Sequence, residues 1–371
     1  MAIEKVNGIE NVDLPQGVQV SVSETEITPG VTELEDGSAI IGEMQEQLEA
    51  SMPVPFNANL AEYIDESELG VISSDITGDI DEDISSRRDW EDQYKGGLEL
   101  LGMNYEDRAE PFEGASGVVH PLLAESVTQF QAQAYREMLP ASGPVRTHIV
   151  GSENPELLAQ AERVKNYMNY QITYEMEEYD PELDQMLFYL PIVGSAFKKI
   201  YFDPSMQRAV SKFVHAEDLI VPYNATDLKT STRITHVVRM DKNEIRKLQL
   251  QGFYKDIDLP SSDSGGSNYD EVKETIDDIQ GVEKGSSYNE EITLYEVHTD
   301  LDLIGFEDIG QDGEPTGLKM PYVVTIVEKS GEILSIKRNF NEGDPFRRKI
   351  PYFVHYKFLP GLGFYGIYCF L

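Results

Sequence analysis

The stretch Leu190-Pro-Ile-Val-Gly-Ser-Ala-Phe-Lys-Lys-Ile-Tyr-Phe-Asp-Pro204 marks the point where the hydrophobic period of the chain changes. Before it, apolar residues recur every three or four positions, which indicates amphipathic helices. Within it, residues 196–202 alternate imperfectly and end at Asp203-Pro204, which indicates a strand followed by a turn. Helices precede strands, so the sequence predicts an α+β fold rather than an alternating βα fold.

Upstream of this change we expect four helices. The first begins near Ser86, because Ser86 and Asp89 have the spacing of a capping box. The second follows Pro121 and ends before Pro140, the third runs over 155–179 before Pro181, and the fourth covers 182–190. The apolar positions of the second are Leu123, Val127, Phe130, Ala134 and Met138, and those of the third are Leu157, Ala161, Val164, Met168 and Ile172. A short β-like segment is expected at 145–150.

Downstream of Pro204 the sequence predicts mostly strands. The predicted strands are 209–215, 219–221, 234–240, 292–303, 322–328, 333–338 and 350–358. Helices are predicted at 241–250 and 269–279, and turns at Asp312-Gly313 and Ser330-Gly331. The expected organisation is a disordered acidic tail (1–85), a helical and mixed α/β region (86–260), a flexible loop with a short helix (261–290) and an antiparallel β-rich region (291–371).

Charge limits the classes of partner. The formal net charge is -37, and residues 1–86 contain one base, Lys5, and 20 of the 67 acids. A chain this acidic is poorly suited to gripping a phosphate backbone, which requires Lys and Arg to displace counterions. Such an irregular acidic tail is typical of disorder, although residues 40–48 are weakly amphipathic and could become helical on a partner.

Cysteine content and hydropathy exclude other classes. Cys369 is the single cysteine, so the chain can form no internal disulfide and no cysteine metal cluster. The N-terminus lacks the pattern of a secretory signal, and no apolar run reaches the roughly 20 residues of a membrane span. We therefore expect no membrane partner.

Two motifs match only part of a known binding signature. Gly361-Leu-Gly-Phe-Tyr-Gly366 has the letters of a dinucleotide fingerprint, but no helix and acidic residue follow at the required spacing. A glycine turn beside aromatic residues is the favoured interpretation. Asp79, Asp81 and Asp83 resemble the start of a calcium loop, but Ile84 and Trp90 occupy positions that require Gly and Glu. A charge run is favoured there.

The remaining candidates also favour a structural role. The six histidines, none spaced as a zinc-binding pair, are His120, His148, His215, His236, His298 and His355. Besides Arg87-Arg88, the compact basic groups are Lys198-Lys199 and Arg347-Arg348-Lys349, for which a solvated face or subunit salt bridges are favoured over phosphate contact. Neither a nucleophile elbow nor a phosphate loop occurs. We therefore assign no catalytic, cofactor-binding or metal-binding residue, and expect a protein that is not an enzyme.

Three segments together carry a resemblance to a known family. The first comprises Arg87-Arg-Asp-Trp90, Gly114-Ala-Ser-Gly-Val-Val-His-Pro-Leu-Leu-Ala-Glu125 and Phe130-Gln-Ala-Gln-Ala-Tyr-Arg-Glu-Met-Leu-Pro140. The second comprises residues 190–204, His215-Ala-Glu-Asp-Leu-Ile-Val-Pro222 and Ile234-Thr-His236. The third is Phe353-Val-His-Tyr-Lys-Phe-Leu-Pro-Gly-Leu-Gly-Phe-Tyr-Gly366. Residues 86–366 resemble the portal (head-to-tail connector) proteins of tailed bacteriophages, in the subgroup related to the portals of short-tailed enterobacterial phages.

The resemblance implies a wedge-shaped subunit of a ring, generally dodecameric, at one vertex of the capsid. Such a ring forms the channel for DNA packaging and ejection, binds the terminase motor, and contacts capsid and tail proteins. It implies assembly in the host cytoplasm and a final place in the virion. Portal chains continue into further helices after the glycine motif, so the resemblance also implies that this chain is an N-terminal portion.

The mechanism of such a ring leaves two questions open. The helices at 121–139 and 155–179 are candidates for ring closure, which requires two complementary patches per subunit. The alternative, that both apolar faces pack within the subunit, is favoured. An acidic channel would repel DNA over about 8–10 Å and keep it from sticking. Other functions considered are an acidic phage scaffold or adaptor that does not encircle DNA, and a nuclease or ATPase subunit of the packaging machine.

Overall fold

The structure is a computed structural model in which the chain divides into two compact units, residues 1–55 and 56–371. It describes residues 31–33, 39–41, 54–101, 121–151, 154–204, 206–259, 291–310, 314–361, 363–367 and 369. In the first unit, β1 (Val31–Glu33) pairs antiparallel with β2 (Ala39–Ile41). All further description concerns the second unit.

Most helices precede the sheets in the chain, as predicted. They are η1 (Leu60–Glu62), α2 (Glu66–Ser86), α3 (Arg88–Leu100), α4 (Leu122–Met138), α5 (Pro155–Tyr170), the π-helical turn η2 (Gln171–Glu175), α6 (Tyr179–Val193) and α7 (Lys242–Leu250). The helix predicted over 155–179 is shorter than expected. It ends before Met176, and Pro181 lies in the first turn of α6, where its missing N–H is tolerated.

Local signals explain the ends of α5 and α6. The Asn154 side chain accepts a hydrogen bond from the backbone N–H of Leu157 at 2.7 Å, and Pro155 occupies the first turn of α5. At the C-terminal end of α6, Gly194 adopts φ +79, and its backbone N–H donates a hydrogen bond to the Leu190 carbonyl. That left-handed conformation favours glycine.

The strands form two antiparallel sheets. The five-stranded sheet has the order β5 (Leu219–Ile220), β6 (Arg233–Asp241), β7 (Glu291–Leu301), β8 (Met320–Val327) and β9 (Ile333–Arg338). The three-stranded sheet has the order β10 (Phe353–Lys357), β3 (Ser195–Asp203) and β4 (Arg208–Val214). The predicted strands at these places and the predicted turn at Ser330-Gly331 are confirmed, and so is the α+β class.

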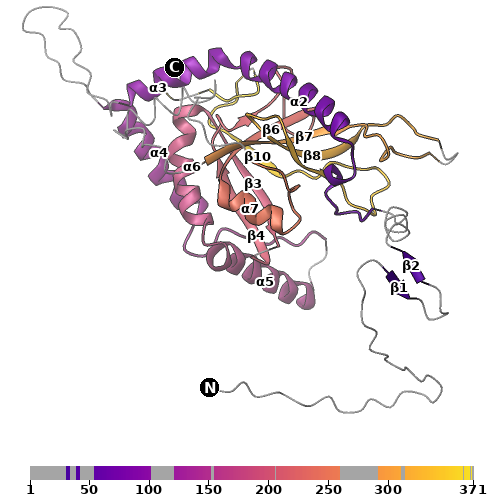
Figure 1. Cartoon of the computed structure of the whole chain (residues 1–371). Coiled ribbons are helices and arrows are strands. Elements are labelled where there is room, and N and C mark those ends of the chain that lie inside the picture. Colours follow the sequence, from indigo (N-terminus) through magenta and orange to yellow (C-terminus); the bar gives the residue numbers. More distant parts are fainter. Residues whose placement is uncertain are drawn as a thin grey trace, which may run out of the picture. The chain divides into compact units, whose positions relative to one another are not determined.

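The elements stack in layers (Figure 1). Helix α6 packs on one face of the three-stranded sheet, and α4 packs against α6. Because side chains alternate along β3, Lys199 points to the sheet face opposite α6. There its ammonium lies 2.6 Å from the Glu296 carboxylate of β7. The three-stranded sheet therefore has α6 on one side and the five-stranded sheet on the other.

The main hydrophobic core extends over both faces of the three-stranded sheet, because it joins residues of α3 and α6 with residues of β3 and of the five-stranded sheet. Its fully buried members include Tyr94, Met186 and Phe197. A smaller core packs α7 against the five-stranded sheet around Ile245 and Leu294. Both cores join segments far apart in the sequence.

The prediction that residues 1–85 form a disordered tail is wrong for the second unit. Helix α2 covers residues 66–86, and its buried residues are Leu69, Ser73, Ile76, Ile80 and Asp83. These positions recur every three or four residues, the spacing of one helix face. Two of the five are polar, which hid the period among the surrounding acids. Order therefore begins before Ser86, at which α2 ends, and the helix predicted to begin near Ser86 is α3, which begins at Arg88.

The predicted boundary between the mixed region and the β-rich region is also wrong. Strand β6 pairs with β7, and β10 pairs with β3, so residues on both sides of position 291 share each sheet. Residues 145–150 form no strand. The predicted loop 261–268, the helix 269–279 and the Asp312-Gly313 turn lie outside the described residues.

Candidate functional site

Helix α5 and the η2 turn that follows it present an apolar face that the described part of the second unit covers only in part. We call Leu157, Ala161, Val164, Met168 and Ile172 the α5 face. No residue of α5, all of which are described, is buried, and Val164 is 44% exposed. Exposed tyrosines continue the surface at Tyr167 and, on η2, at Tyr174.

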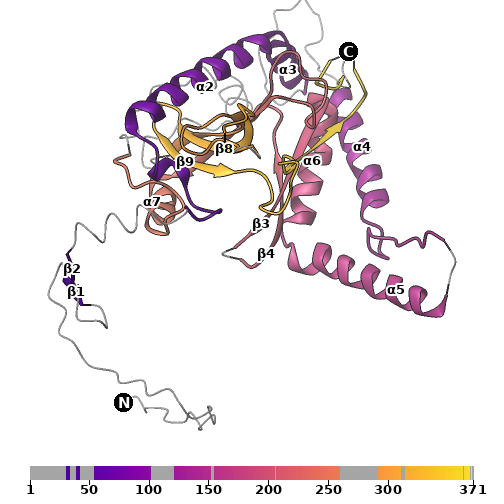
Figure 2. The ribbon, with the colours of Figure 1, turned by 90° about the vertical axis from the view of Figure 1, so that its right-hand side faces the viewer.

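The contact that holds α5 in place is narrow and polar. The Asn169 side chain accepts from the Val145 N–H at 2.9 Å and donates to the Val145 carbonyl at 3.2 Å. The Thr147 hydroxyl donates to the carbonyl of Ala161. Figure 2 shows α5 leaving the lower end of α6 and projecting away from the sheets. Most of the α5 face, at Leu157, Val164 and Met168, is therefore exposed in the described part of the chain.

Helix α4 has a similar sequence pattern but is packed inside the unit. Val127 is fully buried, and Phe130 meets Phe358 edge to face at 5.2 Å between ring centroids. Polar contacts tie α4 to α6, because Gln131 donates to the Asp184 carboxylate at 2.8 Å and Tyr135 donates to Asp180. The expectation that both predicted helices pack within the subunit therefore holds for α4, whereas in the described part of the chain most of the α5 face is exposed.

The three segments that carry the sequence resemblance meet in one place. Trp90 stacks on Tyr365 with 4.3 Å between ring centroids. Gly194 and Gly366 approach so closely that a Cβ on either would collide with the backbone of the other. The Ser195 hydroxyl accepts from the Gly366 N–H at 2.8 Å. The glycine motif is thus a turn beside aromatic residues, as predicted, and it packs against the end of α6.

A buried ion cluster fixes the junction between α2 and α3 to the sheets. The Arg87 guanidinium donates to the carbonyls of Ala216, Glu217 and Leu219 and pairs with Glu91 at 2.8 Å. The Glu217 carboxyl accepts from the Tyr189 hydroxyl at 2.8 Å. Burial and, less strongly, the adjacent Asp218 carboxylate raise the pKa of Glu217 to about 7.

A second buried cluster links the two sheets. Glu296 accepts from Lys199 at 2.6 Å and contacts the His298 ring nitrogen Nε2 at 2.8 Å. Burial alone would raise the pKa of Glu296, but Lys199 and His298 hold it well below its usual range. Burial lowers the pKa of the nearby His236 to about 3, so this histidine is neutral at ordinary pH. The cluster joins the sheets electrostatically.

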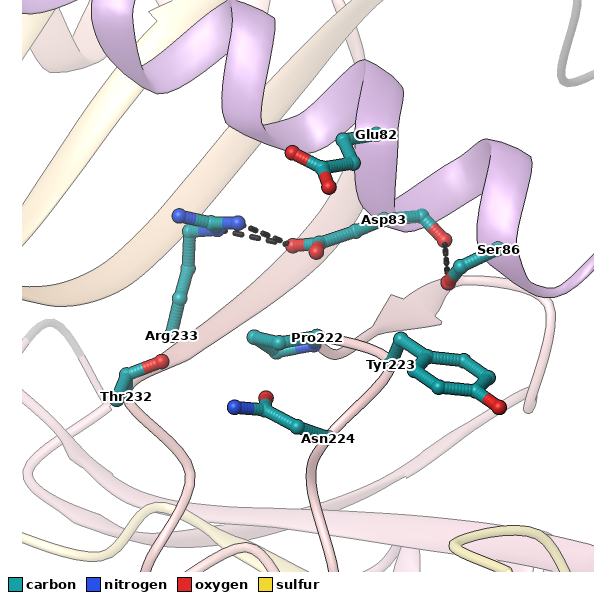
Figure 3. A pocket seen from close by; sticks show the side chains of 8 residues that line it. All are labelled: Glu82, Asp83, Ser86, Pro222, Tyr223, Asn224, Thr232 and Arg233. Atoms are coloured by element: carbon teal, nitrogen blue, oxygen red, sulfur yellow. Dashed lines mark hydrogen bonds and ion pairs between the residues drawn. The ribbon is translucent and has the colours of Figure 1, made fainter.

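A cavity of about 480 Å³ lies between α2 and the segment that joins β5 to β6 (Figure 3). Arg233 closes one side, where it donates to Asp83 at 2.7 and 2.9 Å and also pairs with Asp79. Tyr223 and Asn224 lie on the side opposite α2. The charge run predicted at Asp79, Asp81 and Asp83 therefore has a more specific role, since two of the three carboxylates anchor α2 to β6.

A neighbouring cavity of about 450 Å³ has an aromatic lining. Trp90, Tyr223 and Tyr365 contribute rings, and Gly361 and Gly363 contribute backbone. The Trp90 ring nitrogen Nε1 has no hydrogen-bond partner among the described residues. Within those residues, no group of three or more His, Cys, Asp or Glu side chains is arranged to hold a metal ion.

The remaining predicted candidates are distributed through the structure. His148 is exposed, His215 follows β4, and His355 lies on β10 against the Phe197 ring at 4.5 Å, while His120 is outside the described residues. Arg347 and Arg348 are engaged within the chain, because Arg347 pairs with Asp308 and Arg348 with Asp344. The Arg348 side chain nevertheless lies on a solvated face, as the favoured interpretation expects, because it is 77% exposed.

Several residues of the buried clusters were not identified from the sequence. Glu217, Arg233 and Glu296 lie far along the chain from the residues they contact, and no local spacing signals such pairs. The exposed residues Ile200 and Phe202 of β3 had a signal, the alternation over 196–202, but alternation does not tell which face a neighbouring helix covers.

The chemistry of the α5 face suits association with another protein surface. The α5 face exposes uncharged apolar side chains on an otherwise acidic chain, and exposed aromatic and aliphatic groups on one surface mark binding sites. Among the described helices, none has the length and apolarity needed to cross a bilayer.

Comparisons with known proteins add no relative. No protein-family model matches the chain, and no curated protein sequence matches it.

Proposed function

We propose that this chain is a structural subunit of a phage portal ring. In the proposal the ring sits at one capsid vertex, forms the channel for DNA packaging and ejection, and binds terminase and then tail proteins. The chain assembles with its own copies in the host cytoplasm and ends in the virion. The choice of a portal among ring-forming proteins rests on the sequence resemblance of residues 86–366.

The observation that carries the proposal is the uncovered α5 face. An apolar helix face that stays exposed in the described part of its unit favours a partner from another chain, because the exposed surface otherwise costs solubility. A ring supplies that partner to every copy at once, because each subunit offers the same surface in turn. The packing of the three resembling segments into one core is consistent with residues 86–366 acting as one unit.

The proposal is tested by the oligomeric state of the purified full chain. We expect rings with a central hole in negative-stain electron microscopy and a matching mass in mass photometry. The variant Val164→Asp should reduce the ring population at least tenfold, because it places a charge in the centre of the α5 face. Asn166→Asp is the control, since it adds the same charge to the exposed opposite side of α5.

Two results would contradict the proposal. Monomers at micromolar concentration would favour the alternative function, an acidic adaptor that binds partners without encircling DNA. An unchanged ring population in Val164→Asp would show that another surface closes the ring. The exposed α5 face would then no longer support the proposal.

A further inference from the structure

We propose that the α5 face of one copy docks on an exposed apolar patch of the three-stranded sheet of the next copy. We call Ile200, Phe202 and Val354 the sheet patch. The proposal deepens the proposed ring function by naming both halves of its subunit contact. It rests on that function in assuming that copies of this chain assemble.

The sheet patch lies on the face of the sheet that α6 covers in part. Strand alternation places Lys198, Ile200 and Phe202 on one face of β3, and register sets Val354 of β10 opposite Lys198. Helix α6 covers the Lys198 end, where Tyr179 lies under the ammonium at 4.1 Å from its ring centroid. Beyond that point Phe202 is 59% exposed, so the helical layer stops before the strands do.

The two surfaces have matching size. The exposed parts of Leu157, Val164, Tyr167 and Met168 amount to on the order of 400 Å². The sheet patch together with Met206, in the turn after β3, offers a similar area. A standard interface buries about 800 Å² per partner, of which roughly 60% is apolar, so each surface supplies most of the apolar part of one side.

Length and charge fit the same pairing. Helix α5 is about 24 Å long and β3 about 30 Å, so a helix laid beside α6 would continue the layer that α6 begins. Neither surface contains a charged residue. On a chain of net charge -37, contact through two neutral patches avoids the repulsion that most other surfaces would meet.

Two different patches on one chain favour a head-to-tail contact over a two-fold one. A two-fold contact between α5 faces would leave every sheet patch in water. A head-to-tail contact covers both and passes on to the next copy, which is the geometry that generates rings. Figure 2 shows the β3–β4 hairpin and α5 leaving the body in different directions, so one copy can meet a neighbour on each.

The test is disulfide cross-linking between two separately marked chains. In a Cys369→Ser background, one full-length chain carries Met168→Cys and the other carries Phe202→Cys; mixing and mild oxidation should give a mixed dimer at more than tenfold the yield of either chain alone. A second variant pair, Asn166→Cys with Phe202→Cys, is the control for random collision, because Asn166 faces away from the α5 face.

The outcomes separate this inference from the proposed function. Dimers of the Met168→Cys chain with itself would show a two-fold contact and overturn the inference. Rings that form without the mixed cross-link would also overturn it, while leaving the ring function intact. A chain that stays monomeric and uncross-linked would overturn both.

Discussion

Helices α4 and α5 have nearly the same sequence pattern and opposite surroundings. Each places an apolar residue every three or four positions, and each carries a valine near its middle. Val127 of α4 is fully buried in the main core, whereas Val164 of α5 is 44% exposed. The pattern therefore predicts that a helix has a face to cover, but not whether the same chain or another one covers it.

The largest effect expected from this difference is on stability, with a matched pair of substitutions. Val127→Asp should lower the free energy of unfolding by about 4 kcal/mol, because it buries an unpaired carboxylate in the main core. Val164→Asp should change the stability of the monomer by less than about 0.5 kcal/mol, because the added carboxylate stays in water. Urea unfolding of both variants, at a concentration where the chain is monomeric, measures the contrast.

An equal loss of unfolding free energy in Val127→Asp and Val164→Asp would contradict the contrast between α4 and α5. It would mean that α5 is covered within a single copy, and both the ring contact and the sheet patch would lose their basis. A small loss in Val127→Asp alone would instead show that α4 is loosely attached.

How far the sequence predicted this contrast depends on the range of the interactions. The strands after Gly194, α4 and the start of α5 follow from periods and turn residues within about ten positions and are confirmed, whereas the β-like segment expected at 145–150 is not a strand. The sequence missed α2 as a helix because Ser73 and Asp83 stand on its buried face. Asp83 can be buried there only because Arg233 supplies the counter-charge from 150 positions away. The exposed α5 face was considered and disfavoured, because periodicity carries no information about which partner is present.

The stability of the core in which α4 and α6 pack also depends on pH, through a contact of α6. Tyr189 of α6 donates to Glu217, whose pKa rises from an ordinary value near 4.5 to about 7 in the folded chain. A raised folded pKa contributes stability that is fully present below about pH 4.5 and is lost as the pH rises through about 7. Glu217→Gln should remove that loss. It should therefore stabilise the chain by up to about 3 kcal/mol at pH 8 and by little at pH 4.5.

Urea unfolding of the wild type and Glu217→Gln at several pH values between 4.5 and 8 measures this difference. Tyr189→Phe serves as the control, because it removes the hydrogen bond but leaves the carboxyl buried, so its stability should still fall with pH. A gap between wild type and Glu217→Gln that stays constant with pH would show that Glu217 is solvated in the folded chain.

The smallest effect separates the two helices at single hydroxyl groups. Tyr135 of α4 donates to Asp180 of α6 and so joins two elements, while the Tyr167 hydroxyl accepts from Gln171 one turn later in the same helical run. Tyr135→Phe should cost about 0.5–1 kcal/mol, because the bond that it removes holds α4 on α6. Tyr167→Phe should cost less than about 0.3 kcal/mol, because a bond along an exposed helix exchanges readily with water. Thermal unfolding resolves a difference of this size. Equal costs would mean that the Tyr135–Asp180 hydrogen bond contributes nothing to the attachment of α4. The burial of Val127 and its apolar neighbours would then be the whole reason that α4 is covered while most of α5 is exposed.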